Sequence, residues 1–185
     1  GVLSVVTGRN SAIVAELCRQ PAVRGLSFTG STEVGRLLLA QCAATVKRVS
    51  MELGGHAPVL VFPDVDVEQA AAAAVTAKYQ TGGQDCLAAN RIFVHRDIYS
   101  RFVEAFARRA RALKVGPGFE PGVDVGPLLN AQTLAKSQEH VADALAKGAR
   151  LVAGGTPHAL GGLFFEPTVL ADVTADMKIM HEETF

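Results

Sequence analysis

The feature that most constrains the fold is an alternation of short apolar, β-branched runs with longer helix-like runs along nearly the whole chain. Apolar runs of roughly four to eight residues are typical of buried strands, and apolar residues three and four apart are typical of helices. The alternation predicts an α/β protein with a mostly parallel sheet, because each helix returns the chain to the same end of the sheet.

The pattern places each expected element along the chain. Strands are predicted at 1–7, 25–29, 46–53, 57–62, 91–95, 150–153 and 168–173. Helices are predicted at 11–19, 31–44, 67–79, 98–113 and 133–147, with a long glycine- and proline-rich loop at 116–130. The paired glycines Gly54 and Gly55 predict a boundary between two domains, 1–54 and 55–185.

Composition limits the possible partners. The net charge is zero, which argues against nucleic acid or an anionic membrane as the main partner. The apolar runs are too short to span a bilayer. Three cysteines without metal-type spacing predict neither a disulfide framework nor a metal site, and they favour a reducing, cytoplasmic setting. The chain opens and stops beside strand-like runs, so we expect it to be a segment of a longer protein.

One of the three cysteines lies in unusual surroundings. Cys86 follows two glycines in "GGQDCLAANR", where the backbone can turn sharply and approach a ligand, and "LAAN" could begin a helix that stabilises a thiolate. Cys86 is therefore a candidate nucleophile, although a structural cysteine remains the alternative. Cys18 and Cys42 lie in apolar helical surroundings and are expected to be small buried hydrophobes.

Two further stretches carry candidate binding or catalytic groups. Glu52 ends the apolar run "RVSMELGG", where a strand-end carboxylate can act as a general base or lie in solvent. In "FTGSTEVG", Gly30 and Ser31 join a strand to a helix, a geometry that can bind phosphate, although most such junctions bind nothing. The five histidines are scattered and are interpreted as surface or structural residues.

Taken together, these motifs resemble the NAD(P)-dependent aldehyde dehydrogenase superfamily. "FTGSTEVG", "MELGGHAPVLVF", "GGQDCLAANR", "DVGPLLN" and "HEETF" look like that family's motifs in the family's order, and the match covers essentially the whole chain. The resemblance implies that 1–54 is the C-terminal part of a cofactor-binding domain. It also implies that 55–185 is the N-terminal part of a catalytic domain, in a parent that forms a homo-oligomer.

The resemblance also implies roles for single residues. Cys86 would attack an aldehyde, forming a thiohemiacetal and then a thioester, and Glu52 would be the base that activates the hydrolytic water. Glu183, rather than the adjacent Glu182, would hydrogen-bond the nicotinamide ribose of NAD or NADP, with Phe185 beside the ring. Gly30 and Ser31 would face the pyrophosphate, and Gly55 would give the nicotinamide room.

The chain departs from the family pattern at three positions. His56 replaces a common Lys, with little expected effect. Asp85 replaces an uncharged residue beside the cysteine and would raise the pKa of the thiol if its carboxylate were close. Gln80 replaces the Arg that is typical of members specific for succinate semialdehyde, although "GGQDCLAANR" is nearest to that branch. The sequence therefore argues against a dicarboxylate semialdehyde and leaves the aldehyde open.

Two other functions compete with a hydrolytic aldehyde dehydrogenase. In a CoA-acylating enzyme the thioester passes to CoA, and such relatives often lack the base, so Glu52 favours hydrolysis. The chain could also be a catalytically silent segment that retains the fold. The family's oxyanion amide and adenine-ribose contacts belong to parts of the fold outside this chain, so we expect the isolated 185 residues to be inactive.

Overall fold

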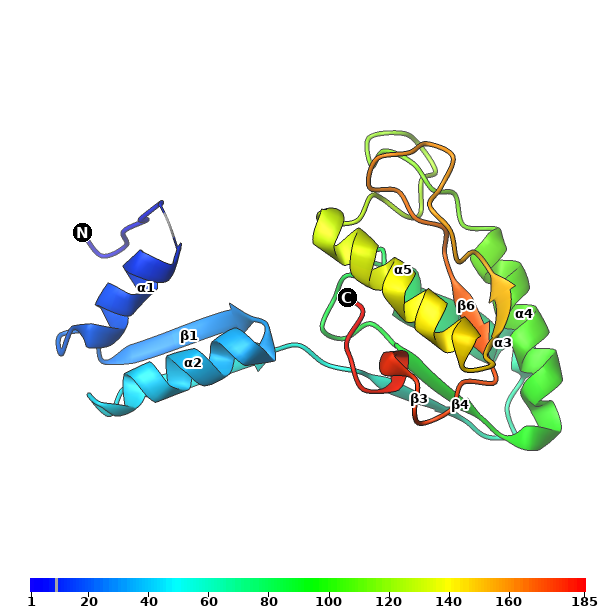
Figure 1. Ribbon diagram of the computed structural model, residues 1–185, viewed down its shortest axis with the longest axis horizontal. Helices are drawn as coiled ribbons and strands as arrows, with labels where there is room; N and C mark the ends of the chain where they lie inside the picture. The colour runs from blue at the N-terminus through cyan, green and yellow to red at the C-terminus, as the bar shows by residue number, and fades with distance from the viewer. Residues whose placement is uncertain (9) are drawn as a thin grey trace. The chain divides into compact units, whose positions relative to one another are not determined.

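The computed structural model describes residues 1–8 and 10–185, which form two compact units, residues 1–54 and 55–185. Both units combine helices with short strands, and two of the three strand pairs are parallel (Figure 1). The predicted α/β class with mostly parallel strands is confirmed. The division falls between Gly54 and Gly55, and the assignment of the units to cofactor-binding and catalytic domains stays a prediction.

The first unit is a βαβ arrangement preceded by a helix. Its elements are α1 (Asn10–Arg19), β1 (Gly25–Gly30), α2 (Thr32–Ala43) and β2 (Arg48–Leu53). Strands β1 and β2 are parallel, with Gly30 opposite Leu53 at their carboxyl ends. Helix α2 begins where Ser31 accepts a hydrogen bond from the Val34 N–H at 3.3 Å, as its sequence predicts for an N-cap.

Two predicted strands in the first unit differ from the structure. The run 1–7 is exposed and forms no strand, because no other strand of the described chain pairs with it, and apolar β-branched residues alone do not make a strand. Strand β2 begins two residues later than predicted because Val46 has a φ of +50°, a turn conformation. Lys47 follows, and its ammonium donates to the carbonyls of Gln20 and Val23.

The second unit holds two small sheets and three long helices. Its elements are β3 (Pro58–Val61), α3 (Val67–Tyr79), β4 (Arg91–Val94), η1 (Arg96–Ile98), α4 (Tyr99–Arg111), α5 (Ala131–Ala146), β5 (Arg150–Ala153), β6 (Val169–Ala171) and η2 (Lys178–Met180). Strands β3 and β4 are parallel, whereas β5 and β6 are antiparallel. Helix α5 and the C-terminal segment (yellow and red in Figure 1) lie side by side.

The main core of the second unit lies where α3 and α4 pack against the strands. Alanines on both helices allow close packing, and Phe102 stacks on Phe106 with ring centroids 5.9 Å apart. The buried members of this core are Val61, Ala71, Ala74, Val75, Tyr79, Ile98, Phe102, Ala105, Phe106, Ala107, Ala110, Val125, Ala153 and Val169. This core supports the loop between α3 and β4, where Cys86 lies.

Candidate active site

Cys86 lies in a tight turn between α3 and β4. Gly82 and Gly83 have φ values of +65° and +77°, which side-chain-bearing residues rarely adopt, and they reverse the chain after α3. The Leu87 N–H donates to Asp85 Oδ1 at 2.7 Å, and the Ala88 N–H donates to the Asp85 carbonyl at 3.0 Å. The expected helix after Cys86 is therefore absent, because Asp85 closes a turn there instead.

Side chains that are distant in sequence hold this loop. Gln84 Nε2 donates to the Pro127 carbonyl at 3.2 Å, and Gln84 Oε1 accepts from the Leu129 N–H at 2.7 Å. The long loop 116–130 is thereby attached to the Cys86 turn. On the other side, Lys78 donates to Asn90 Oδ1 and packs beneath Gly83, where an added Cβ would lie 3.1 Å from the Lys78 ammonium. The turn is anchored at both ends.

The surroundings of Cys86 differ from those of the other two thiols. Cys86 is half-buried, whereas Cys18 and Cys42 are each 2% exposed and have their Sγ atoms 3.8 Å apart. Burial raises the pKa of the Cys18 thiol, and the neighbouring Cys42 adds to the shift. Within the described residues the Cys86 N–H has no hydrogen-bond partner. Cys86 therefore combines an accessible thiol with a free backbone donor.

Gly55 and Glu183 are brought to the same place as Cys86. The Gly55 N–H donates to Glu183 Oε1 at 3.1 Å, across 128 positions of sequence. A Cβ added at Gly55 would lie 3.2 Å from the Cys86 carbonyl oxygen, so the two backbones are almost in contact. The second unit thus gathers three of the residues singled out from the sequence.

The adjacent carboxylates Glu182 and Glu183 have different partners. Glu182 Oε2 lies 3.3 Å from His140 Nε2, whereas Glu183 binds the Gly55 backbone. One carboxylate therefore attaches the segment to α5, and the other faces the Cys86 loop. Adjacent side chains on an extended backbone point in opposite directions, which accounts for the two different partners.

Burial changes the protonation of two groups near this cluster. Desolvation lowers the pKa of Lys78 to about 8, and the negative charge of Glu183 opposes that shift. Desolvation also lowers the pKa of His56, which favours a neutral ring. Both His56 ring nitrogens lack a hydrogen-bond partner within the described residues. A Lys with a pKa of about 8 is still mostly protonated at pH 7, so Lys78 keeps most of its positive charge near Glu183.

Glu52, Gly30 and Ser31 belong to the first unit. Glu52 is exposed on β2 opposite Thr29, at the carboxyl end of the parallel pair. A Cβ at Gly30 would lie 2.5 Å from the Phe28 ring, so a larger residue there would require the Phe28 side chain to move. The N–H groups of Thr32 and Glu33, at the start of α2, have no partner among the described residues. They are free to meet an anion.

A cavity of about 720 Å³ lies in the second unit. It lies between β4 and β6, and its walls include Lys78, Gly83 and Phe185. Cys86 and Glu183 do not line it. The cavity therefore borders the candidate site without containing the proposed nucleophile. Phe185, which was expected beside the nicotinamide, faces this cavity.

Two classes of feature are not found in the part of the chain that the structure describes. No group of three or more His, Cys, Asp or Glu side chains is arranged to hold a metal ion. None of the described helices is long and apolar enough to cross a bilayer.

Sequence reasoning missed three residues that shape the site, Lys78, Gln84 and His140. His140 carried a usable signal, because it shares the buried stripe of α5 with Ser137, Val141 and Ala144. A polar residue on a buried stripe requires a partner. No local signal identified Gln84 or Lys78, whose partners depend on the tertiary fold.

Comparisons with known proteins identify the family of the chain. The model of the family described as "Aldehyde dehydrogenase family" matches residues 1–185. The 3-sulfolactaldehyde dehydrogenase of Pseudomonas putida is 56% identical over 185 residues, which is 100% of this chain and 38% of that protein. The succinate-semialdehyde dehydrogenase GabD of Escherichia coli strain K12, whose name specifies NADP(+), is 50% identical with the same coverage.

A solved structure shows the same fold. The succinate-semialdehyde dehydrogenase from Burkholderia pseudomallei superposes with a TM-score of 0.97 at 52% identity, covering 99% of this chain and 38% of that one. The chain thus spans 38% of the length of the curated relatives it matches.

Proposed function

The chain belongs to the aldehyde dehydrogenase family, and from this premise we propose that the full-length protein oxidises an aldehyde to a carboxylic acid with NAD or NADP. The observation that carries the proposal is the meeting of Cys86, Gly55 and Glu183 around one turn. A half-buried thiol beside a free backbone N–H is suited to attack a carbonyl and to stabilise the oxygen that becomes negative.

The chemistry at Cys86 follows from its nucleophilicity. The Cys86 thiolate adds to the aldehyde carbon and forms a thiohemiacetal, whose oxygen is stabilised by N–H donors such as that of Cys86. Loss of hydride from this carbon leaves a thioester on Cys86. Water then attacks the thioester, the thiolate leaves, and a carboxylic acid is released. Glu52 is proposed to accept the proton of that water, as the general base.

The residues present fit a nicotinamide dinucleotide. Glu183 has one carboxylate oxygen held by the Gly55 N–H, and the other has no partner among the described residues, so it can accept from a ribose hydroxyl. Gly55 lacks the side chain that would crowd a planar ring. The free N–H groups that follow Ser31 at the start of α2 suit a pyrophosphate. When bound, the dinucleotide supplies the hydride acceptor.

Two observations bear on the substrate and point in opposite directions. The relatives at 50–56% identity are named for aldehydes that carry a second, anionic group. Gln80, however, supplies no positive charge at the position where members specific for succinate semialdehyde typically have an Arg, and it is exposed at the end of α3. A panel of plain, dicarboxylate-derived and sulfonate-bearing aldehydes, each with NAD and with NADP, separates these alternatives by kcat/KM. A cytoplasmic location remains part of the proposal.

Burst kinetics of the full-length protein test the mechanism. Glu52→Gln should slow thioester hydrolysis by about 10²-fold or more while sparing hydride transfer, giving a burst of reduced cofactor and then slow turnover. Mass spectrometry of the quenched reaction should find the acyl group on the Cys86 peptide. An acyl group elsewhere, or wild-type turnover in Glu52→Gln, would reject these roles. Acyl-CoA as the product in the presence of CoA would instead identify the acylating reaction.

A further inference from the structure

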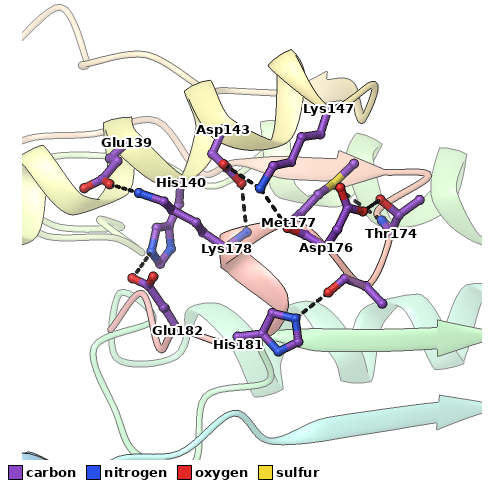
Figure 2. Close-up of polar contacts among 11 residues, drawn as sticks. Glu139, His140, Asp143, Lys147, Thr174, Asp176, Met177, Lys178, His181 and Glu182 are labelled. Carbon is purple, nitrogen blue, oxygen red and sulfur yellow. Dashed lines mark hydrogen bonds and ion pairs between the residues drawn. The ribbon is translucent and has the colours of Figure 1, made fainter.

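The C-terminal segment 174–185 is attached to α5 by a row of polar contacts (Figure 2). The Lys178 N–H donates to Asp143 Oδ2 at 2.8 Å, and the Lys178 ammonium pairs with Glu139. The Lys178 and Glu139 side chains are largely exposed, and exposed ion pairs contribute little to stability. These contacts place η2 on α5, but they leave the last residues, which include Glu183, to be fixed by something else.

His140 is the buried member of this row. Its side chain is only 1% exposed, and its ring lies between Glu182 and Thr184. Nε2 lies 3.3 Å from Glu182 Oε2, and Nδ1 lies 3.0 Å from Thr184 Oγ1. A carboxylate only accepts hydrogen bonds, so Nε2 carries the proton, and in a neutral ring the Thr184 hydroxyl then donates to Nδ1. Both ring nitrogens are satisfied by one short stretch of chain.

The residue between these two partners is Glu183. Fixing the side chains on both sides of Glu183 restricts its own backbone dihedrals, and the carboxylate is thereby directed at the Gly55 N–H. We propose that His140 is a positioning residue for Glu183, holding the carboxylate in the orientation that binds the cofactor. This inference rests on the proposed function for the role of Glu183, but the positioning itself is a statement about the structure.

Two measurements on the full-length protein test the inference, one with dinucleotide and one without. Without dinucleotide, hydrogen exchange of the Gly55 amide reports whether Glu183 is in place. His140→Ala should speed this exchange by about tenfold or more, because the acceptor is no longer held. Ile98→Ala is the matched control, since Ile98 is 3% exposed but belongs to the main core at η1. Ile98→Ala should leave the exchange rate of the Gly55 amide closer to the wild-type rate than His140→Ala does.

With dinucleotide, calorimetric titration measures the coupling between His140 and Glu183. Glu183→Gln should weaken binding about tenfold in the wild type, but by less than about threefold when His140→Ala is already present. Independent, multiplicative losses would overturn the inference. Thr184→Ser keeps the hydroxyl and should bind like wild type, whereas Thr184→Val should show part of the His140→Ala loss.

The outcomes separate the two proposals. If Glu183→Gln leaves dinucleotide affinity unchanged, the proposed cofactor role of Glu183 fails, and the exchange of the Gly55 amide alone decides the positioning. If His140→Ala leaves that exchange unchanged, His140 does not position Glu183, whatever the titrations give. Should His140→Ala fail to fold, the exchange of the Gly55 amide and the dinucleotide affinity are measured on His140→Gln and Thr184→Val instead.

Discussion

The two units use cysteine and packing in opposite ways. The first unit has a core of three buried residues, Cys18, Leu38 and Cys42, and two of these are thiols that serve as small hydrophobes. The second unit has a core of fourteen buried residues, and its only cysteine lies outside that core, half-exposed on a turn. The two buried thiols and the half-buried one therefore differ in their packing, as their neighbours in sequence predicted.

The difference extends to the apolar surface. Both units expose large apolar side chains, but these are denser in the first unit, where they lie on α2 and in the N-terminal run and include Leu37, Leu39 and Val2. Apolar groups left in water contribute nothing to folding, so the first unit is the less self-sufficient of the two. In the second unit, contacts from Gln84 and Lys78 hold the Cys86 turn in place. Four predictions test this contrast, in order of decreasing expected effect.

The largest effect is expected from exchanging sulfur for oxygen at the two kinds of cysteine. In the full-length protein, Cys86→Ser should reduce kcat by at least about 10³-fold, because a hydroxyl is a far weaker nucleophile without a dedicated base. Cys42→Ser, the matched control, should cost stability and leave kcat close to wild type. Steady-state assays and thermal unfolding of both variants measure the contrast. Comparable losses of kcat would mean that the assigned nucleophile is wrong.

Removing a core side chain should cost more in the second unit. Phe102→Ala should lower the free energy of unfolding by about 3–5 kcal/mol, because the stacked Phe106 and the surrounding helices cannot collapse into the space. Leu38→Ala should cost about 2 kcal/mol, because its cluster holds only three buried residues. Denaturant titrations followed by hydrogen exchange in each unit measure both losses. Equal costs would contradict the contrast in packing.

Thiol reagents should distinguish the cysteines by rate. Brief iodoacetamide treatment at pH 8 should modify Cys86 more than about tenfold faster than Cys18 or Cys42, which react only after local opening. Burial raises the pKa of Cys18, so its labelling should also rise only at a higher pH than that of an ordinary thiol. Peptide mapping across pH 7–10, a range around the ordinary thiol pKa of about 8.5, gives both results. Similar rates for all three thiols would show that the first unit is not folded as described.

The smallest effect is a pH dependence that arises beneath the Cys86 turn. Burial lowers the pKa of Lys78 to about 8 in the folded protein, below its unfolded value of about 10.4. Between these values the unfolded state binds more protons, so stability should rise as pH increases from 8 to 10. Lys78→Met should remove this rise, which amounts to about 1–2 kcal/mol. If the stability of the wild type and of Lys78→Met changed in the same way with pH, the Lys78 ammonium would be solvated rather than buried.

Elements with strong local signals were predictable. Helix α3 and strand β5 occupy the predicted residues, and Ser31 caps α2 as expected. The strand predicted at 1–7 is absent because a strand forms only with a partner strand, and no local sequence pattern supplies one. The helix that could begin after Cys86 does not form, because the Asp85 side chain accepts a hydrogen bond from the backbone and closes a turn. Helix propensities do not predict when a side chain competes with the backbone in this way.

The candidate site was predictable to a smaller extent. The glycines before Cys86 predicted the turn, and the choice of Glu183 over Glu182 came from the family resemblance and stays a prediction. The supporting contacts of Gln84 with Leu129 and of His140 with Thr184 join residues more than forty positions apart. Such pairs depend on the tertiary fold, and a single polar side chain such as Gln84 or His140 gives no indication of its distant partner.

The hydrogen bond from Gly55 to Glu183 has a consequence in time. It joins residues 128 positions apart, so it can form only after nearly the whole second unit has been synthesised. At about 5–20 residues per second, the ribosome makes Cys86 roughly 5–20 s before it makes Glu183. During that interval the nascent chain carries Cys86, the proposed nucleophile, without the Glu183 carboxylate. Pulsed alkylation of stalled ribosome-bound chains would measure how reactive the Cys86 thiol is before Glu183 is made.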